Sequence, residues 1–89
     1  EALACGLVQK LVSAENIETY VRDYALTISH NAPLTIKAMK QIGIEILKNP
    51  DERDLLLCEQ LASACFDSED YKEGRKAFME KRKPNFKGL

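Results

Sequence analysis

Apolar residues recur at steps of three and four between residues 14 and 30. The repeating positions are Ile17, Tyr20, Val21, Tyr24, Ala25 and Ile28, which form one continuous stripe on a helix. The run His30-Asn31-Ala32-Pro33 marks the end, because Pro33 suits the first turn of a following helix, where its missing N–H is not required. The pattern therefore predicts an amphipathic helix over residues 14–30.

A second helix is predicted over residues 33–48. Its apolar positions spread around more of the circumference than those of the first helix: Leu34, Ile36, Ala38, Met39, Ile42, Ile46 and Leu47. This spread indicates a central place in the fold. Gly43 lies in the middle of the helix, where glycine costs about 1 kcal/mol relative to alanine. We interpret Gly43 as a point of close helix–helix approach.

Two further helices follow. Asp51 is the expected N-cap of a third, strongly apolar helix that reaches Phe66. Ser68 is the expected N-cap of a fourth helix over residues 69–83, which Pro84 ends. This last helix has an acidic first turn and a basic last turn, with Glu69 and Asp70 at one end and Lys81, Arg82 and Lys83 at the other.

The first twelve residues break this helical pattern. They are interpreted as the end of a helix, a stop at Gly6 and a short apolar run over residues 7–12 that can pack as an extended segment. A single strand needs a neighbour, and the remaining sequence offers none. We therefore expect an all-α fold, a small bundle of about four helices with a short extended segment at the N-terminus. Residues 1–12 are expected to be the seam to a body outside these 89 residues.

Composition limits the class of protein. Eighty-nine residues, 45% of them apolar and 30% charged, make one small domain that is too apolar to be disordered. Such a domain has modest stability unless it docks onto something. No apolar run approaches the ~20 residues of a membrane span. The chain begins with Glu1 rather than Met, so we expect it to be part of a longer chain.

Charge is distributed unevenly along the chain. Residues 71–89 carry seven Lys and Arg against two Glu, whereas residues 1–70 carry six basic and twelve acidic side chains. A basic end of this kind indicates an anionic partner. Carboxylates interleaved through the earlier part of the chain make nucleic-acid or membrane binding a weak explanation.

Cysteine and histidine show no reactive or metal-binding pattern. Cys58 and Cys65 lie seven residues apart on one predicted helix, about 10 Å and too far for a disulfide. We expect all three cysteines to be small, buried or half-buried apolar residues in a reducing compartment. His30 has no partner motif and is expected to stabilise the carbonyls at a helix end. No catalytic or metal-binding residue is predicted.

Phe78 and Lys81 are the candidate ligand-binding pair. They are three residues apart on the predicted fourth helix and would be neighbours on its surface. An aromatic ring can pack on a nucleotide base while an ammonium meets a phosphate. The alternative is that Phe78 belongs to the core and Lys81 is solvated, and spacing alone favours this alternative.

Three stretches resemble the C-terminal end of the enoyl-CoA hydratase/isomerase (crotonase) family. The first is EALACGLVQKLV, residues 1–12, and the second runs from Ala25 through Asn31-Ala32-Pro33 to Lys40. The third covers Phe66, Ser68 and Asp70, then Glu73-Gly74, Ala77-Phe78 and Glu80-Lys81-Arg82-Lys83-Pro84-x-Phe86. The resemblance covers the whole chain, and the third stretch is the specific one.

The resemblance implies a C-terminal helical domain of the trimerisation type. In that family an N-terminal ββα spiral carries the oxyanion-hole amides and the acid/base carboxylates, and none of these matches a residue here. Glu1 matches an ordinary glutamate, so no catalytic role is carried over. The residues that match Phe78 and Lys81 can approach a CoA nucleotide bound mainly by a neighbouring subunit, which implies a cofactor-binding role for both.

The expected function follows from this resemblance. The chain would assist oligomerisation and complete part of a CoA pocket, in an enzyme that hydrates enoyl-CoA thioesters in fatty-acid or related acyl-CoA metabolism. Expected partners are the catalytic core, neighbouring subunits of a homo-trimer or hexamer, and the CoA thioester substrate, with no separate cofactor, nucleic acid or membrane. The expected location is the cytoplasm or mitochondrial matrix. The alternatives are a structural assembly module of a non-hydratase member, and a stand-alone four-helix acyl-CoA carrier, which the absence of Trp disfavours.

Overall fold

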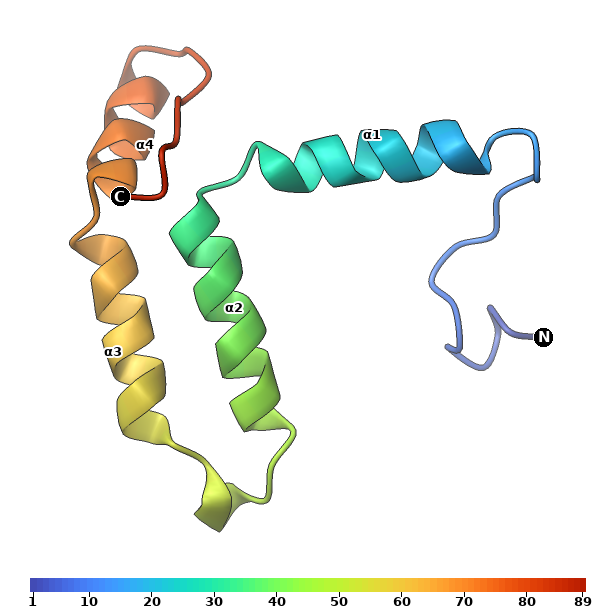
Figure 1. Cartoon of the computed structure of the whole chain (residues 1–89), viewed down its shortest axis with the longest axis horizontal. Coiled ribbons are helices and arrows are strands. Elements are labelled where there is room, and N and C mark those ends of the chain that lie inside the picture. The colour runs from blue at the N-terminus through green and yellow to red at the C-terminus, as the bar shows by residue number, and fades with distance from the viewer.

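The computed structural model describes all 89 residues. It contains four α-helices and one short 3-10 helix, joined by turns and irregular segments, and no strand (Figure 1). The elements in chain order are α1 (Ile17–Ser29), α2 (Pro33–Ile46), η1 (Pro50–Glu52), α3 (Leu55–Phe66) and α4 (Glu69–Met79). The predicted all-α class with four helices is confirmed. The helix ends differ from the prediction at several points, and each difference has a local cause.

Helices α2 and α3 lie side by side and antiparallel, and α4 continues beyond α3 (Figure 1). The connection between α2 and α3 is held by Glu45, whose side chain is buried. Its carboxylate accepts from the Asp54 backbone N–H at 3.0 Å and pairs with Lys48 Nζ at 2.7 Å. Hydrogen bonding to Lys48, and secondarily to Asp54, lowers the pKa of Glu45. The Arg53 guanidinium donates to the Ile46 carbonyl at 3.0 Å and so satisfies the open end of α2.

The predicted N-cap of the third helix is wrong by three residues. Pro50 begins the 3-10 turn η1 and Arg53 then returns to extended backbone, so Asp51 lies inside a separate turn. Asp54 is the cap of α3, because its Oδ1 accepts from the Leu57 N–H at 2.8 Å.

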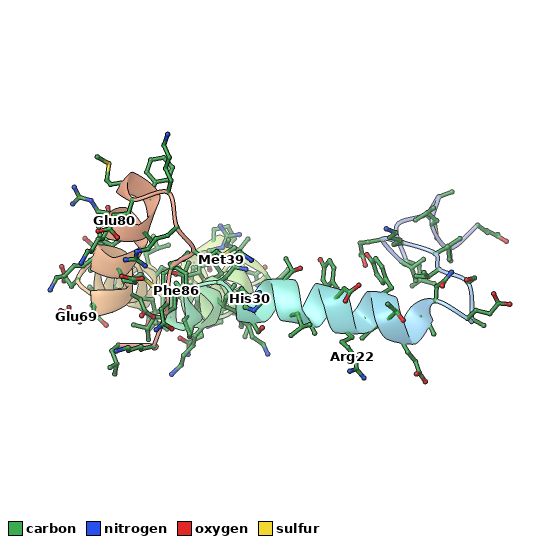
Figure 2. All side chains as sticks on the ribbon, turned by 90° about the horizontal axis from the view of Figure 1, so that it is seen from above. Arg22, His30, Met39, Glu69, Glu80 and Phe86 are labelled. Carbon is green, nitrogen blue, oxygen red and sulfur yellow. The ribbon has the colours of Figure 1, made fainter.

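Helix α1 projects away from the other three helices (Figures 1 and 2). None of its residues is buried, and Val21 and Tyr24 on its apolar stripe are exposed. The radius of gyration is 17.0 Å, whereas a compact chain of this length would have about 12 Å. The apolar stripe is therefore present as predicted but has no partner within these residues.

The ends of α1 also differ from expectation. Its first helical residue is Ile17, because residues 14–16 form a turn in which Asn16 Nδ2 donates to Ser13 Oγ at 2.9 Å. At the other end, the carbonyl-binding role expected of His30 belongs to Asn31. The Asn31 amide donates to the carbonyls of Thr27 at 2.8 Å and Ile28 at 3.3 Å. Asn has two amide donors that reach back to the last turn.

The N-terminal residues form a turn followed by an irregular segment. The Cys5 N–H donates to the Glu1 carbonyl at 3.0 Å, and Gly6 then takes a left-handed conformation with φ of 76°. The predicted stop at Gly6 is confirmed, but residues 2–6 form a turn rather than the predicted end of a helix. Residues 7–12 pair with no strand, and Lys10 Nζ lies 4.5 Å from the ring centre of Tyr20 on α1.

Few side chains are enclosed. Five residues are buried, namely Ala38, Glu45, Ser68, Asp70 and Ala77, and only the two alanines are apolar. The close helix–helix approach predicted at Gly43 is wrong within these residues, since a Cβ added there would have no atom within 4 Å. All three cysteines are free. Cys58 and Cys65 are half-buried as expected, but Cys5 is exposed because the turn that carries it packs on no helix.

Candidate functional site

The N-terminus of α4 is capped as the sequence predicts. Ser68 Oγ accepts from the Tyr71 N–H at 3.0 Å and donates to the Cys65 carbonyl at 2.6 Å. The hydroxyl thus joins the end of α3 to the start of α4, and Ser68 is buried between them. This joint fixes the direction in which α4 leaves α3.

The C-terminus of α4 lies four residues earlier than predicted, at Met79. The Lys81 N–H donates to the Phe78 carbonyl at 3.2 Å, and the Arg82 N–H donates to the Ala77 carbonyl at 3.0 Å. Together with the φ of 52° at Lys81, these bonds form a Schellman motif with lysine at the position that glycine usually takes. The prediction that Lys81, Arg82 and Lys83 form the last helical turn is therefore wrong.

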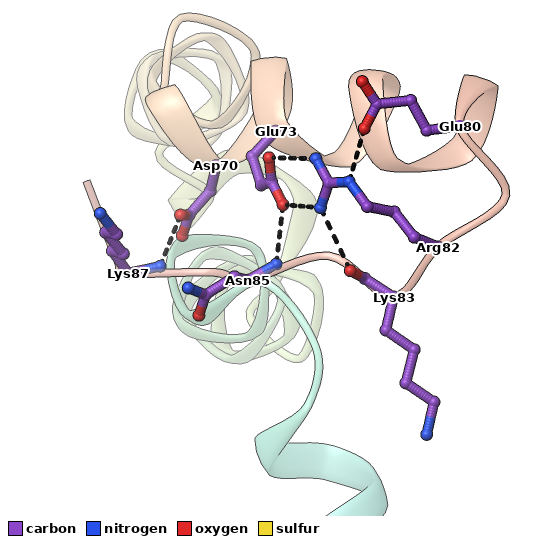
Figure 3. A network of polar contacts seen from close by, with 7 residues as sticks. All are labelled: Asp70, Glu73, Glu80, Arg82, Lys83, Asn85 and Lys87. Atoms are coloured by element: carbon purple, nitrogen blue, oxygen red, sulfur yellow. Dashed lines mark hydrogen bonds and ion pairs between the residues drawn. The ribbon is translucent and has the colours of Figure 1, made fainter.

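After this turn the chain runs back beside α4 (Figure 1). We call residues 83–89 the C-terminal strap. Asp70 holds its far end, because Oδ1 accepts from the Lys87 N–H at 2.7 Å (Figure 3). Its Oδ2 accepts from the Gly88 N–H, also at 2.7 Å. The Asp70 N–H in turn donates to the Leu89 carbonyl at 3.0 Å. Only 3% of Asp70 is exposed, so this carboxylate is a structural anchor.

Glu73 and Arg82 hold the near end of the strap. The Glu73 carboxylate accepts hydrogen bonds from Arg82 Nη1 at 2.6 Å and Nη2 at 2.9 Å (Figure 3). It also accepts one from the Asn85 backbone N–H at 2.9 Å. Arg82 Nε donates to Glu80 at 2.6 Å. The hydrogen bond from Arg82, assisted by the one from Asn85, lowers the pKa of Glu73 to about 2. The same two carboxylates raise the pKa of Arg82.

Sequence reasoning missed the anchoring role of Asp70 and Glu73. The sequence placed Asp70 in the first turn of a helix, where a carboxylate needs no distant partner. One available signal was their spacing of three, which puts both carboxylates on one helix face. A second signal was the segment after Pro84, since its backbone N–H groups need acceptors that no further strand supplies.

The ion pairs divide the basic residues of the C-terminal stretch into two groups. Arg82 and Lys72 are paired with carboxylates, Lys72 with Glu69 at 2.5 Å. The others have no carboxylate within 4 Å, namely Arg75, Lys76, Lys81, Lys83 and Lys87. The stretch therefore presents a positive surface despite its internal salt bridges.

The structure places the candidate pair at the end of α4. Phe78 is in the last helical turn with 83% of its surface exposed, and Lys81 is at the left-handed turn that follows. The hydrogen bond between their backbones keeps the two residues adjacent. Phe78 is therefore not a core residue within these 89 residues. The ligand role of the pair remains a prediction.

An apolar groove of about 560 Å³ lies between α2, α3, α4 and the strap. Its larger apolar and aromatic lining side chains are Met39, Ile42, Phe66, Tyr71, Phe78 and Phe86. Phe86 reaches the groove from the strap, and a Cβ added at Gly74 would lie 3.5 Å from its ring. This distance is an ordinary van der Waals contact, so the Phe86 ring packs directly beside the α4 backbone at Gly74. Phe78 borders the groove, whereas Lys81 lies outside it.

Neither a metal-binding cluster nor a membrane-spanning helix is present. No three His, Cys, Asp or Glu side chains converge closely enough to hold a metal ion. None of the helices has both the length and the apolar character that crossing a membrane requires. The features with a distinctive geometry are therefore the Phe78–Lys81 turn, the carboxylate-held strap and the groove.

Comparison with known proteins gives one consistent family. The model of the enoyl-CoA hydratase/isomerase family matches residues 1–89. Methylmalonyl-CoA decarboxylase of Escherichia coli K12 is 41% identical over 91 residues, which cover 98% of this chain and 34% of that protein. (E)-Benzylidenesuccinyl-CoA hydratase of Thauera aromatica is 40% identical over 88 residues, 99% of this chain and 34% of that protein.

Solved structures show the same fold. The crystal structure of an enoyl-CoA hydratase from Bacillus anthracis superimposes with a TM-score of 0.87 at 29% identity, covering 99% of this chain and 34% of that one. The chain thus spans about a third of the length of the relatives that it matches.

Proposed function

Because the chain belongs to the enoyl-CoA hydratase/isomerase family, we propose that its 89 residues act as the helical C-terminal region of a larger enzyme that acts on CoA thioesters. The region contributes to subunit assembly and to part of the CoA pocket. The groups that carry out the chemistry lie outside residues 1–89. The share of each relative that the chain covers, about a third, supports this division.

The assembly role is supported by uncovered apolar surface. Helix α1 has no buried residue, and the groove between α2, α3 and α4 is lined by large apolar side chains that are exposed, including Met39 and Phe66. Contiguous apolar surface of this kind marks a contact with another protein surface. The rest of the enzyme and neighbouring subunits, in a homo-trimer or hexamer, would cover it. A full-length enzyme that sediments as a monomer would contradict this role.

The reaction that we propose is the addition of water across the 2,3-double bond of an enoyl-CoA thioester. The support is that several relatives are named as hydratases, among them the Thauera protein and a crotonyl-CoA hydratase of Syntrophomonas wolfei. A second candidate is an assembly module in an enzyme with different chemistry. It is favoured by the 41% identity to a relative that is named as a decarboxylase.

The CoA-binding role rests on the turn at the end of α4. The exposed Phe78 ring is available to pack on the adenine base, and Lys81 has no carboxylate within 4 Å to compete with a phosphate. A flat ring next to a free ammonium suits a nucleotide that carries a phosphate. The exposure of Phe78 beside this unpaired lysine is the observation that carries the proposal.

Isothermal titration of CoA against the full-length enzyme tests this role. Stacking of a base on an aromatic ring contributes about 1–3 kcal/mol, so Phe78→Ala should weaken CoA binding by about 5- to 150-fold. Lys81→Ala should weaken it by a smaller factor. Met79→Ala is the matched control, because Met79 is a similarly exposed apolar neighbour to which the proposal assigns no contact. Unchanged affinity in the Phe78→Ala and Lys81→Ala variants would overturn the proposal.

A further inference from the structure

Arg82 binds two carboxylates at once, and both flank the turn that carries Lys81. Glu73 lies on α4 and takes the two terminal nitrogens of the guanidinium, whereas Glu80 is the C-cap residue of α4 and takes Nε at 2.6 Å (Figure 3). A planar fork that makes two parallel bonds to one carboxylate has a fixed direction. The Arg82 side chain is therefore held firmly against α4.

The turn that Arg82 holds has an unfavourable backbone conformation. Lys81 is the one residue other than glycine with a positive φ, 52°. A side chain at this position crowds the following carbonyl, so such a conformation persists only where neighbouring contacts impose it. The next residue, Arg82, supplies two such contacts. Its backbone N–H donates to the Ala77 carbonyl, and its guanidinium donates to the Glu73 carboxylate. They tie the chain immediately after Lys81 to α4.

Arg82 also determines the charge around Lys81. Without a cation between them, Glu73 and Glu80 would attract the Lys81 ammonium and repel an approaching phosphate. In the structure both carboxylates are bound by Arg82, and Lys81 has no carboxylate within 4 Å. The ammonium therefore remains available.

We propose that Arg82 is a positioning residue for Lys81. It fixes the left-handed turn and occupies the two nearby carboxylates, and thereby presents the Lys81 ammonium to a phosphate of CoA. This inference rests on the proposed CoA-binding function. It assigns Arg82 no contact with the ligand.

A double-mutant cycle in the full-length enzyme tests the inference. CoA affinity is measured by isothermal titration for the wild type, Lys81→Ala, Arg82→Gln and the double variant. We expect Lys81→Ala to weaken binding by about fivefold in the wild type, the range of an exposed charge contact. In the Arg82→Gln background the same change should have almost no effect, because the lysine is no longer held in place.

Two further variants separate this role from a general effect on folding. Arg82→Lys keeps the charge but loses the fork, so the effect of Lys81→Ala should be intermediate. Lys72→Gln removes a cation from the other end of α4 and should leave the effect of Lys81→Ala unchanged. A merely structural Arg82 would change thermal stability without changing the size of the Lys81 effect. If Arg82→Gln does not fold, the Arg82→Lys cycle alone decides.

The outcomes distinguish the two proposals. If Lys81→Ala weakens CoA binding equally in the wild-type, Arg82→Gln and Arg82→Lys backgrounds, the positioning role is overturned and the CoA-binding role stands. If Lys81→Ala has no effect in the wild type, the proposed phosphate contact fails first, and the positioning role fails with it. Loss of the Lys81 effect in the Arg82→Gln background supports the inference.

Discussion

Replacing Asp70 by Asn should release the far end of the C-terminal strap. Asp70 is 3% exposed, and its carboxylate offers one oxygen to each of two backbone N–H groups, those of Lys87 and Gly88. Asn keeps one of these acceptors but replaces the other oxygen by an NH2 group. That group would face a backbone N–H, so two donors would oppose each other. One of the two bonds that the Asp70 side chain makes to the strap is then lost.

The size of the effect follows from the lost bond. A hydrogen bond to a charged group contributes about 1.5–3 kcal/mol, and a middle value of about 2 kcal/mol corresponds to about a 30-fold rise in the opening equilibrium of the strap. Asp70→Ala removes both bonds and should have a larger effect. The helix itself should persist, because the Ser68 cap does not depend on the Asp70 side chain.

Amide hydrogen exchange of the folded protein measures this opening. The Lys87 and Gly88 amides should exchange about 30-fold faster in Asp70→Asn, and the Asn85 amide, which binds Glu73 instead, should change less. Glu69→Gln is the matched control, since it makes the same charge change one residue away on an exposed side chain. Exchange at Lys87 and Gly88 that rises by less than about threefold would refute the anchoring role of Asp70.

Two further predictions concern the turn beyond α4. Lys81→Gly should raise the free energy of unfolding by about 1 kcal/mol, because glycine adopts the positive φ without crowding; chemical denaturation checks this, and an equal gain in Lys81→Ala would contradict it. The folded pKa of Glu73 is depressed from 4.5 to about 2, so its stabilising contribution is present above pH 4.5 and is lost as the pH falls from there toward 2. Glu73→Gln should flatten the pH dependence of unfolding in that window, and an unchanged slope would show that another group titrates there.

The helices could be predicted from the sequence because their signals are local. The stripe of α1 and the Ser68 cap depend on residues within one or two turns, and both are confirmed. Helix ends were predicted less well, because the sequence does not show which of several neighbouring polar residues or turns forms the cap. The predicted cap of α3 was Asp51, but Pro50 starts a separate turn that contains it, and Asp54 forms the cap instead.

The candidate site shows the same division. A sequence motif was enough to name Phe78 and Lys81 as candidates. Their geometry could not be predicted, because the turn after α4 is held by an ion pair between Arg82 and Glu73, nine residues earlier. The anchoring role of Asp70 depends on backbone groups 17 and 18 residues away. No periodicity or cap rule reaches over that distance. What sequence spacing does supply is the pair of carboxylates on one helix face.

The C-terminal charge surplus combines two different functions. Arg82 is fully engaged in ion pairs within the chain, because its bonds to Glu73 and Glu80 hold the turn after α4 against the helix. Lys81 is left unpaired at the apex of that turn for the same reason, since the carboxylates that would bind it are already occupied. A count of charges treats the two cations as equivalent. In the structure, Arg82 is paired with Glu73 and Glu80, whereas Lys81 has no ion pair. Within the basic stretch, the turn after α4 therefore holds one cation, Arg82, in place and leaves its neighbour Lys81 unpaired.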